Sequence, residues 1–590
     1  MSIQLQLASV VNQAIKDKYG LEIGDNTVQI QPTTPDKTGD FTVILFPLLK
    51  LKLDTPENLG NNIGNYLKTN LKEAENFEVI KGFLNVTLSD TFWINYLNDL
   101  STDFEEHTSL KTGVGQTVMV EYSGPNTNKP LHLGHLRNNF LGYAIANILE
   151  ATGCKVVKAN LVNDRGVHIC KSMYAWQHFG NDETPESSGI KGDHLVGKYY
   201  VLFDKELQKQ MKENNTDKPT ETPIMKEIQE MLRKWEANDK EVRELWQKMN
   251  DWVLAGFDKT YKRCGVSFER VYKESETYLL GKKIVEEGLN KGIFYKKDDG
   301  SIWVDLTEFG LDHKLLLRGD GTSVYITQDL GTAQLKYDEY KIDKSIYVIG
   351  NEQEYHLKVL IGALKKLNVP YANAIFHLSY GMVELPTGKM KSREGTVVDA
   401  DDLMEEMVKT AAKLTTEHGK TEGLNEMEIK NLHETLGLGA LKYYLLKVDP
   451  VKQMLFDPQE SIDFKGHTGS FIQHSYARTR SIQRKAVALL FPKTFNPLTI
   501  QLLPEEKELL RLLHQFKNAL AEAADKHNPS ILANYVFEIA KKYNRFYYEL
   551  PILQAETPEI IQSRLLLSNQ TGRIIKKIMN LLGIEVPEQM

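Results

Sequence analysis

The sequence predicts an α/β fold in which a central parallel sheet has helices on both faces, with a small α+β unit before it and an all-α region after it. Two observations support this prediction. From about residue 116, short apolar runs rich in β-branched residues alternate with stretches whose apolar residues recur at helical spacing. From about residue 425 onward, the pattern is almost wholly helical. The alternation is typical of a Rossmann-type, doubly wound sheet.

Residues 1–112 form a separate unit by their pattern. The segments 42–46 and 83–88 are apolar and β-branched, which predicts two strands, and charged helical stretches separate them. This mixture predicts a small α+β domain.

The predicted parallel sheet begins with a strand over 117–122, a helix over 136–150 and a strand over 155–162. A polar tract over 181–262 then interrupts the alternation, with Glu and Lys paired four residues apart. The tract is too irregular for heptads, so we predict an inserted helical subdomain rather than a coiled coil.

Further strands are predicted after this insertion, at 293–305, 323–327, 346–349 and 375–378. Residues 298–301 have the composition of a hairpin turn, so the first of these segments should fold back on itself.

The composition is that of an ordinary globular protein with several domains, since 41% of the 590 residues are hydrophobic and 26% are charged. No apolar run is long enough to span a bilayer, and the first residues lack the pattern of a signal peptide. Three cysteines lie far apart with no Cys-x-x-Cys spacing: Cys154, Cys170 and Cys264. This usage predicts a cytoplasmic protein without structural zinc.

The charge is unevenly distributed along the chain. The net charge is −7, yet residues 471–590 contain 16 Lys and Arg against 11 Asp and Glu. A basic end suits local contacts with phosphates. A helical surface rich in Lys explains it equally well, so charge alone leaves the partner open.

Two histidines stand where the first helix of the sheet domain should begin. Residues 132–135 read His-Leu-Gly-His, and Lys129 and Arg137 flank them. A helix N-terminus favours anions, and a glycine lets a ligand approach the backbone closely. We expect a nucleotide-phosphate site. The alternatives are metal ligation, which needs a third ligand, and ordinary surface histidines.

A second candidate, residues 388–395, is cationic, is bracketed by glycines and follows the strand predicted at 375–378. There Lys389 and Arg393 would neutralise charge that develops on a leaving polyphosphate. The alternative is a solvated basic turn.

Together the two stretches resemble the paired motifs of class I aminoacyl-tRNA synthetases, and their surroundings resemble the arginyl-tRNA synthetases. The segments that carry this resemblance are 121–126, 128–137, 162–166, 325–329, 464–469, 473–478 and 581–590. It implies a catalytic domain over 113–424 that includes the helical insertion, an N-terminal additional domain over 1–112 that contacts the tRNA elbow, and a helical linker with an all-α anticodon-binding bundle over 425–590.

The resemblance implies ATP-dependent activation of L-arginine to arginyl-adenylate and transfer to the 3′ end of arginine tRNA. It also implies a monomer in the cytoplasm that uses Mg²⁺ bound to the phosphates of ATP, with no zinc and no membrane partner. The residues implied for ATP are His132, Gly134, His135, Lys389, Met390 and Arg393. Catalysis would rest on His132, His135, Lys389 and Lys129.

The residues implied for L-arginine are Glu121, Ser123, Gly124, Asn126, His135, Tyr325, Asp329 and Gln353. A guanidinium is planar and permanently charged, so its pocket needs carboxylates, which Glu121 and Asp329 would supply. Without the family context, Glu121 is a surface acid at a strand end and Asp329 is the N-cap of a helix over 330–337.

One departure from the general class I pattern concerns Ser392, which stands where the Lys-Met-Ser-Lys-Ser loop has its second lysine. Many arginyl-tRNA synthetases share this feature and carry a lysine ahead of the first histidine. Our hypothesis is that Lys129 supplies the missing phosphate contact.

The resemblance implies tRNA contacts at Phe83 and Asn85 in the first unit and at Tyr476, Arg478 and Tyr547 near the end. Exposed aromatic rings could stack on unpaired bases while cations meet phosphates, although aromatic residues at helical spacing are more often core. The alternatives to an arginine enzyme are a class I enzyme for another amino acid, a silent tRNA-binding paralogue and a plain nucleotidyltransferase.

Overall fold

The computed structural model describes residues 2–24, 27–34, 37–384, 398–417, 423–463, 465–488 and 500–590. They form two compact units, each described by itself. Unit 1 comprises Met1–Thr108, Arg478–Phe516 and Lys541–Ile574, and unit 2 comprises Ser109–Ala477, Lys517–Ala540 and Ile575–Met590.

Unit 1 contains a four-stranded antiparallel sheet in the order β1-β2-β4-β3. Its strands are β1 (Gln29–Pro32), β2 (Phe41–Ile44), β3 (Ala74–Ile80) and β4 (Phe83–Leu88). Its first helices are α1 (Ile3–Tyr19), α2 (Phe46–Leu49), α3 (Pro56–Asn70), α4 (Asp90–Thr102) and α5 (Phe104–Thr108). Both predicted strands are present, and β1 and β3 were missed. The α+β prediction for this segment is therefore confirmed.

Helix α1 shows why this segment is helical. Ser2 caps its first turn, and Leu7, Val11 and Ile15 recur every four residues and are buried. Gly20 ends the helix at φ +69°, which glycine adopts without strain.

Unit 2 is built on a five-stranded parallel sheet in the order β12-β11-β5-β6-β7. These strands are β5 (Thr117–Glu121), β6 (Lys155–Val162), β7 (Arg270–Lys273), β11 (Lys344–Gly350) and β12 (Ile375–Tyr380). The chain runs outward from β5 through β6 to β7, then returns to the other side of β5 with β11. The strand order therefore reverses between β5 and β11, and ligands bind at such a switch point in open α/β sheets.

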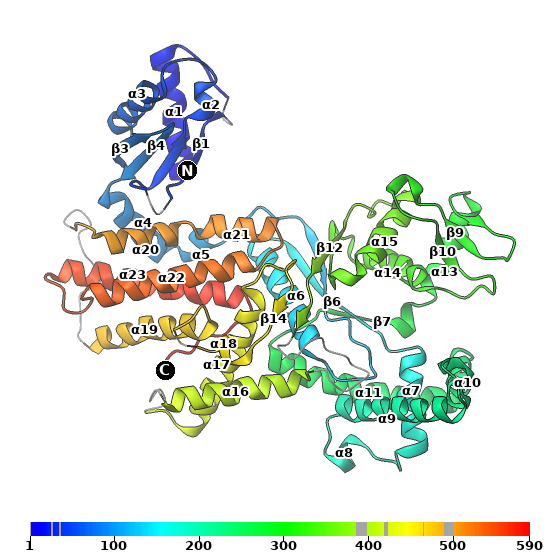
Figure 1. Ribbon diagram of the computed structural model, residues 1–590. Helices are drawn as coiled ribbons and strands as arrows, with labels where there is room; N and C mark the ends of the chain where they lie inside the picture. Colours follow the sequence, from blue (N-terminus) through cyan, green and yellow to red (C-terminus); the bar gives the residue numbers. More distant parts are fainter. Residues whose placement is uncertain are drawn as a thin grey trace. The chain divides into compact units, whose positions relative to one another are not determined.

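Helices α7, α9, α10 and α11 lie together between β6 and β7 (Figure 1), and the insertion predicted at 181–262 corresponds to α8 through α11. The elements are α7 (Val167–Phe179), α8 (Pro185–Ser188), α9 (Gly192–Glu213), the 3₁₀ turn η2 (Pro219–Glu221), α10 (Pro223–Glu236) and α11 (Lys240–Cys264). The first helix after β5 is α6 (Leu133–Ala151).

A small antiparallel sheet, β10-β9-β8, contains the predicted hairpin. The elements around it are α12 (Glu274–Thr277), α13 (Leu280–Asn290), β8 (Tyr295–Lys296), β9 (Ile302–Val304), η3 (Thr307–Phe309), β10 (Lys314–Leu317), α14 (Tyr325–Tyr340), η4 (Asn351–Gln353) and α15 (Glu354–Lys366). The strand predicted at 323–327 is wrong. Thr327 caps the start of α14 by accepting a hydrogen bond from the Val324 N–H (3.2 Å), so the helix begins at Tyr325.

The rest of the chain is helical apart from two short paired strands, β13 (Val383–Glu384) and β14 (Met454–Leu455). Its helices are α16 (Ala400–Glu417), α17 (Glu426–Leu446), α18 (Pro458–Ser461), α19 (Gly469–Ala488), α20 (Pro504–His514), α21 (Phe516–Asp525), α22 (Ser530–Glu549) and α23 (Pro558–Leu581). The all-α prediction for this region is confirmed.

The last residues of the chain return to the core of unit 2. The Lys442 ammonium donates to the Gly583 carbonyl (2.6 Å), and the Gln473 amide donates to the Glu585 carbonyl (2.8 Å). The Asn147 amide on α6 donates to the Leu581 carbonyl (3.4 Å). Among the described residues, no helix is long and apolar enough to cross a membrane.

Candidate active site

A cavity of about 430 Å³ lies at the switch point of the parallel sheet. Residues 121–124 line it after β5, residues 348–350 line it at the end of β11, and His132, Gly134 and His135 line it at the start of α6. The fold therefore brings together three segments that are far apart in the sequence.

Asn138 on α6 fixes the junction of the two central strands. Its side-chain oxygen accepts from the Ser123 N–H (2.5 Å), and its amide donates to the Val348 carbonyl (2.7 Å). Ser123 has φ +78° and Gly124 has φ +59°, so the backbone turns sharply directly after β5. This turn points the end of β5 at the cavity.

Hydrogen bonds from nearby backbone N–H groups fix the ring orientations of the two motif histidines. His132 Nδ1 accepts from the Gly134 N–H (3.1 Å), and His135 Nδ1 accepts from the His132 N–H (3.2 Å). Because Nδ1 is the acceptor in each neutral ring, the proton of each ring lies on Nε2. A Cβ at Gly134 would lie 3.0 Å from Cε1 of His132, so glycine leaves room for that ring.

Both imidazoles are held neutral. Burial, followed by the charge of Lys129, lowers the pKa of His132 to about 4. Burial, followed by the charges of His132 and Lys129, lowers the pKa of His135 well below its ordinary value. The site thus offers two neutral Nε2–H donors, which suit a phosphate oxygen.

Two carboxylates line the same cavity. Glu121 ends β5 and is 7% exposed, and Asp329 lies on α14, where it accepts from His356 Nε2 (2.5 Å). Asp329 is therefore inside the helix, and the alternative interpretation of it as an N-cap is wrong. The alternative interpretation of Glu121 as a surface acid is also wrong, because its side chain is buried.

Lys336 and His356 also line this cavity, and the sequence analysis did not select them. Lys336 follows Asp329 by seven residues, which is two helical turns, so helical spacing alone places both on one face of α14. This spacing went unrecognised because a strand was predicted at 323–327 and the helix only from residue 330.

Three residues assigned to the arginine site differ in their placement. Gln353 lines the cavity from the 3₁₀ turn η4. Tyr325 is the first residue of α14, is 76% exposed and does not line the cavity. Asn126 is exposed, forms a backbone bridge with Asn163 and also lies outside the lining.

Lys129 lines a neighbouring cavity of about 490 Å³ that shares His132 with the first. Backbone contacts on both sides of His132 join this region to residues 398–400. The Leu133 N–H donates to the Val398 carbonyl (3.1 Å), and the Ala400 N–H donates to the Leu131 carbonyl (3.0 Å). Lys389, Met390, Ser392 and Arg393 lie outside the described residues.

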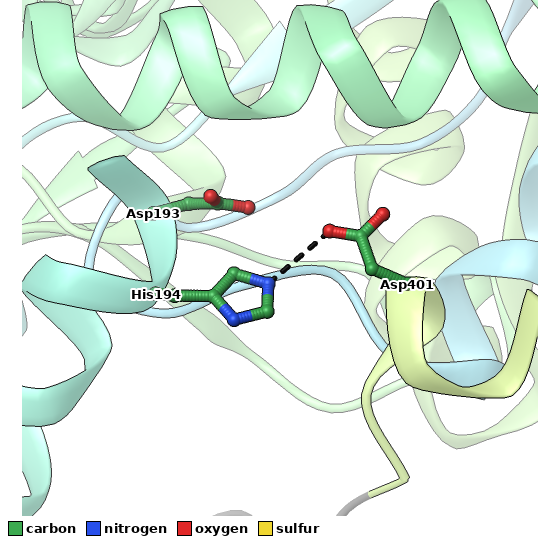
Figure 2. A group of neighbouring side chains, drawn as sticks. All are labelled: Asp193, His194 and Asp401. Atoms are coloured by element: carbon green, nitrogen blue, oxygen red, sulfur yellow. Dashed lines mark hydrogen bonds and ion pairs between the residues drawn. The ribbon is translucent and has the colours of Figure 1, made fainter. Parts of the chain in front are cut away.

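Asp193 and His194 on α9 approach Asp401 on α16, and Figure 2 shows His194 directed at the Asp401 carboxylate. Their potential ligand atoms lie within 4.8 Å of one another. The Lys191 ammonium, however, lies 2.6 Å from Asp401 and 3.0 Å from Asp193, where it supplies the positive charge that a metal ion would bring. We assign no metal to this cluster.

The residues assigned to tRNA divide by exposure. Asn85 is 3% exposed and accepts from the Thr42 hydroxyl (2.7 Å), and Tyr476 is 3% exposed. Neither side chain is available to stack on a base. Phe83 is half-buried against Phe46.

Arg478 and Tyr547 lie together in unit 1. The Arg478 guanidinium lies 4.5 Å from the ring centre of Tyr547 and 4.8 Å from that of Tyr548, which is 72% exposed. Tyr548 was not selected from the sequence, because helical spacing does not show which of two adjacent tyrosines faces outward.

Comparisons with known proteins cover the whole chain. The family model for "tRNA synthetases class I (R), catalytic domain" matches residues 99–457, the "DALR anticodon binding domain" matches 472–590, and the "Arginyl tRNA synthetase N terminal domain" matches 5–88. Proteins named arginine–tRNA ligase from Phocaeicola vulgatus and Bacteroides thetaiotaomicron are each 52% identical over 100% of both chains. The fold is similar to the solved arginyl-tRNA synthetase of Thermus thermophilus, with a TM-score of 0.82 and 24% identity over 100% of both chains.

Proposed function

This chain belongs to the arginine–tRNA ligase family of class I tRNA synthetases, and on that premise we propose that it activates L-arginine with ATP and transfers the arginyl group to the 3′ end of arginine tRNA. The resemblance inferred from the sequence motifs is confirmed at the level of the family. The observation that best supports the activity is a single cavity lined both by the carboxylates of Glu121 and Asp329 and by the two neutral imidazole N–H donors of His132 and His135.

In the proposed activation step, a carboxylate oxygen of arginine attacks the α-phosphorus of ATP. A bond forms between them, the bond from the α-phosphorus to the bridging oxygen breaks, and pyrophosphate leaves. His132 and His135 would donate Nε2–H groups to phosphate oxygens, and Lys129, Lys389 and Arg393 would neutralise the leaving charge. Gly134 and Met390 would border the nucleotide. Positioning and charge stabilisation supply most of the rate in such a reaction.

For arginine itself, Glu121 and Asp329 would face the guanidinium. Ser123, Gly124, His135 and Gln353 would hold the α-amino and carboxylate ends. Asn126 and Tyr325 would join them only after moving, because neither lines the cavity. Lysine lacks the guanidinium fork and would leave acceptors unpaired, so the pocket favours arginine.

The proposed assembly uses Mg²⁺ carried by the phosphates of ATP rather than by a dedicated protein site, and no zinc. We propose that the protein acts as a monomer. The three cysteines are free, which supports a cytoplasmic location. We further propose that residues 1–112 contact the tRNA elbow, that 113–424 form the catalytic domain and that 425–590 contain the anticodon-binding bundle, with the Arg478 and Tyr547 cluster as a stacking surface.

The decisive experiment is amino-acid-dependent exchange of labelled pyrophosphate into ATP, with each of the twenty amino acids, with and without tRNA. We expect exchange with arginine alone among them. Exchange driven by another amino acid would favour a different class I enzyme, and exchange without any amino acid would favour a nucleotidyltransferase. Binding of tRNA with no exchange under either condition would identify a silent paralogue.

A further inference from the structure

A buried lysine lines the cavity that the proposed function assigns to arginine. Lys336 is 1% exposed and follows Asp329 and Thr332 along one face of α14, and all three line the cavity. An unpaired ammonium at such a depth would be strongly unfavourable, so its partners define its role.

The partners of Lys336 are polar groups of the same cavity. Its Nζ lies 2.5 Å from Glu121 Oε2 and 3.1 Å from the hydroxyl of Tyr347. The rings of Tyr347 and Tyr272 face the ammonium at 4.3 Å and 5.8 Å from their centres. Burial acts to lower the pKa of Lys336, but the Glu121 carboxylate and the Tyr347 hydroxyl together raise it by more. The pKa of Lys336 is therefore above its ordinary value, and the lysine stays charged.

Glu121 has no other partner among the described residues. Its Oε2 atom is buried and has only the ammonium beside it. Its second oxygen remains for a ligand. A carboxylate held in this way presents one oxygen in a fixed direction, which a guanidinium N–H can meet.

We propose that Lys336 is a positioning residue that orients the Glu121 carboxylate for the arginine side chain and sets the charge of the pocket. This inference rests on the proposed function. The formal charges of the Glu121 and Asp329 carboxylates and the Lys336 ammonium sum to −1, which matches one guanidinium. Without the ammonium, the carboxylate of Glu121 would be a buried charge with no compensating partner, which is strongly unfavourable.

The test compares steady-state pyrophosphate exchange of Lys336→Met, Lys336→Arg, Glu121→Gln and the double variant Lys336→Met/Glu121→Gln with the wild type. We expect Lys336→Met to raise the KM for arginine ~10–100-fold, the effect of losing one charge-assisted hydrogen bond, and to leave the KM for ATP within ~2-fold. Lys336→Arg restores a cation beside Glu121 and should recover most of the arginine KM. Lys358→Met, at an exposed lysine on the neighbouring helix α15, is the matched control and should leave both constants unchanged.

The double variant keeps the inference testable if Lys336→Met alone fails to fold, because it removes both buried charges. If Lys336 acts through Glu121, the double variant has the arginine KM of Glu121→Gln alone. A further rise in the double variant, or equal increases in the KM values for arginine and ATP in Lys336→Met, would overturn the positioning role. No arginine-dependent exchange in the wild type would overturn the proposed function itself, and the inference with it. Arginine-dependent exchange with an unchanged KM in Lys336→Met would overturn the inference alone.

Discussion

The protonation state of His132 gives the sharpest test of the site, because its environment separates it from an ordinary histidine. Burial lowers its pKa from 6.5 to about 4, and the Lys129 charge adds to the effect. With a pKa of about 4, only ~1% of the imidazole is cationic at pH 6, whereas an ordinary histidine would be roughly three-quarters cationic there. The neutral ring donates from Nε2 in the same geometry across this range. Protonation of His132 should therefore leave the exchange rate unchanged from pH 8 to pH 6.

The measurement follows the ¹³Cε1 resonance of labelled histidines from pH 8 to pH 5, with His132→Asn used to assign the signal. Lys129→Met removes a nearby cation, so it should raise the pKa of His132 while leaving the ring buried. Exchange rates are recorded over the same pH range in the wild type and in both variants. The activity of Lys129→Met tests separately whether this lysine contacts the phosphates.

A His132 resonance that titrates with a midpoint near 6.5 would show that burial does not hold this ring neutral. A wild-type exchange rate that falls between pH 8 and pH 6 in proportion to the cationic fraction of that ring would show the same. The interpretation of Lys129 as a cause fails if its replacement leaves the midpoint where it was. The titration of the His132 resonance can be followed without any amino-acid substrate.

Burial raises the pKa of Glu274 to about 7, so its ionisation in the folded protein costs stability that accumulates as the pH rises from 4.5 to 7. Glu274→Gln should therefore raise the free energy of unfolding at pH 8 by up to ~3 kcal/mol, seen as a higher thermal midpoint, and should have no such effect at pH 4. An equal gain in stability at both pH values would contradict burial as the cause. In unit 1, Arg564 donates to Glu506 (2.9 Å) and both side chains are buried, so Arg564→Met should cost ~3–5 kcal/mol in denaturant unfolding. The double variant Arg564→Met/Glu506→Leu should recover most of the lost free energy of unfolding. A denaturation midpoint of the double variant below that of Arg564→Met would show that the unpaired carboxylate is not the cause of the loss. Gly134→Ala places a Cβ against the His132 ring. Exchange kinetics should therefore show a kcat/KM for ATP that is reduced ~10–100-fold, with an unchanged thermal midpoint. A wild-type kcat/KM for ATP would show that the ring has room to move.

Local patterns predicted four of the five strands of the parallel sheet, because a buried strand and an amphipathic helix each have their own apolar spacing, and β7 was missed. They failed at 323–327, where Val324 and Tyr325 favour a strand but the Thr327 side chain caps a helix. That error hid the face of α14 that carries Asp329 and Lys336. The ion pair between Lys336 and Glu121 joins residues 215 positions apart, so only the tertiary fold places them together.

Burial was the other limit of the sequence analysis. Nothing in the spacing of residues 473–478 separates Tyr476, which is 3% exposed, from a ring on the surface. Asn85 is a polar residue of a type usually found at the surface, but its side chain accepts a hydrogen bond inside its sheet. The motif at 132–135 was recognisable from its residues alone, and its two side chains bond to their own backbone.

The return of the final residues to unit 2 has a consequence for synthesis on the ribosome. Asn147 on α6 donates to the carbonyl of Leu581, which is 434 residues later. At ~5–20 residues per second, a ribosome needs about 20–90 s to make the intervening chain. During that time the helix that begins at the histidine motif lacks one of its packing partners, and the apolar surface that Leu582 and Ile584 later cover stays open to other chains. A chaperone that binds exposed apolar segments would therefore act on this protein mainly before its last residues emerge.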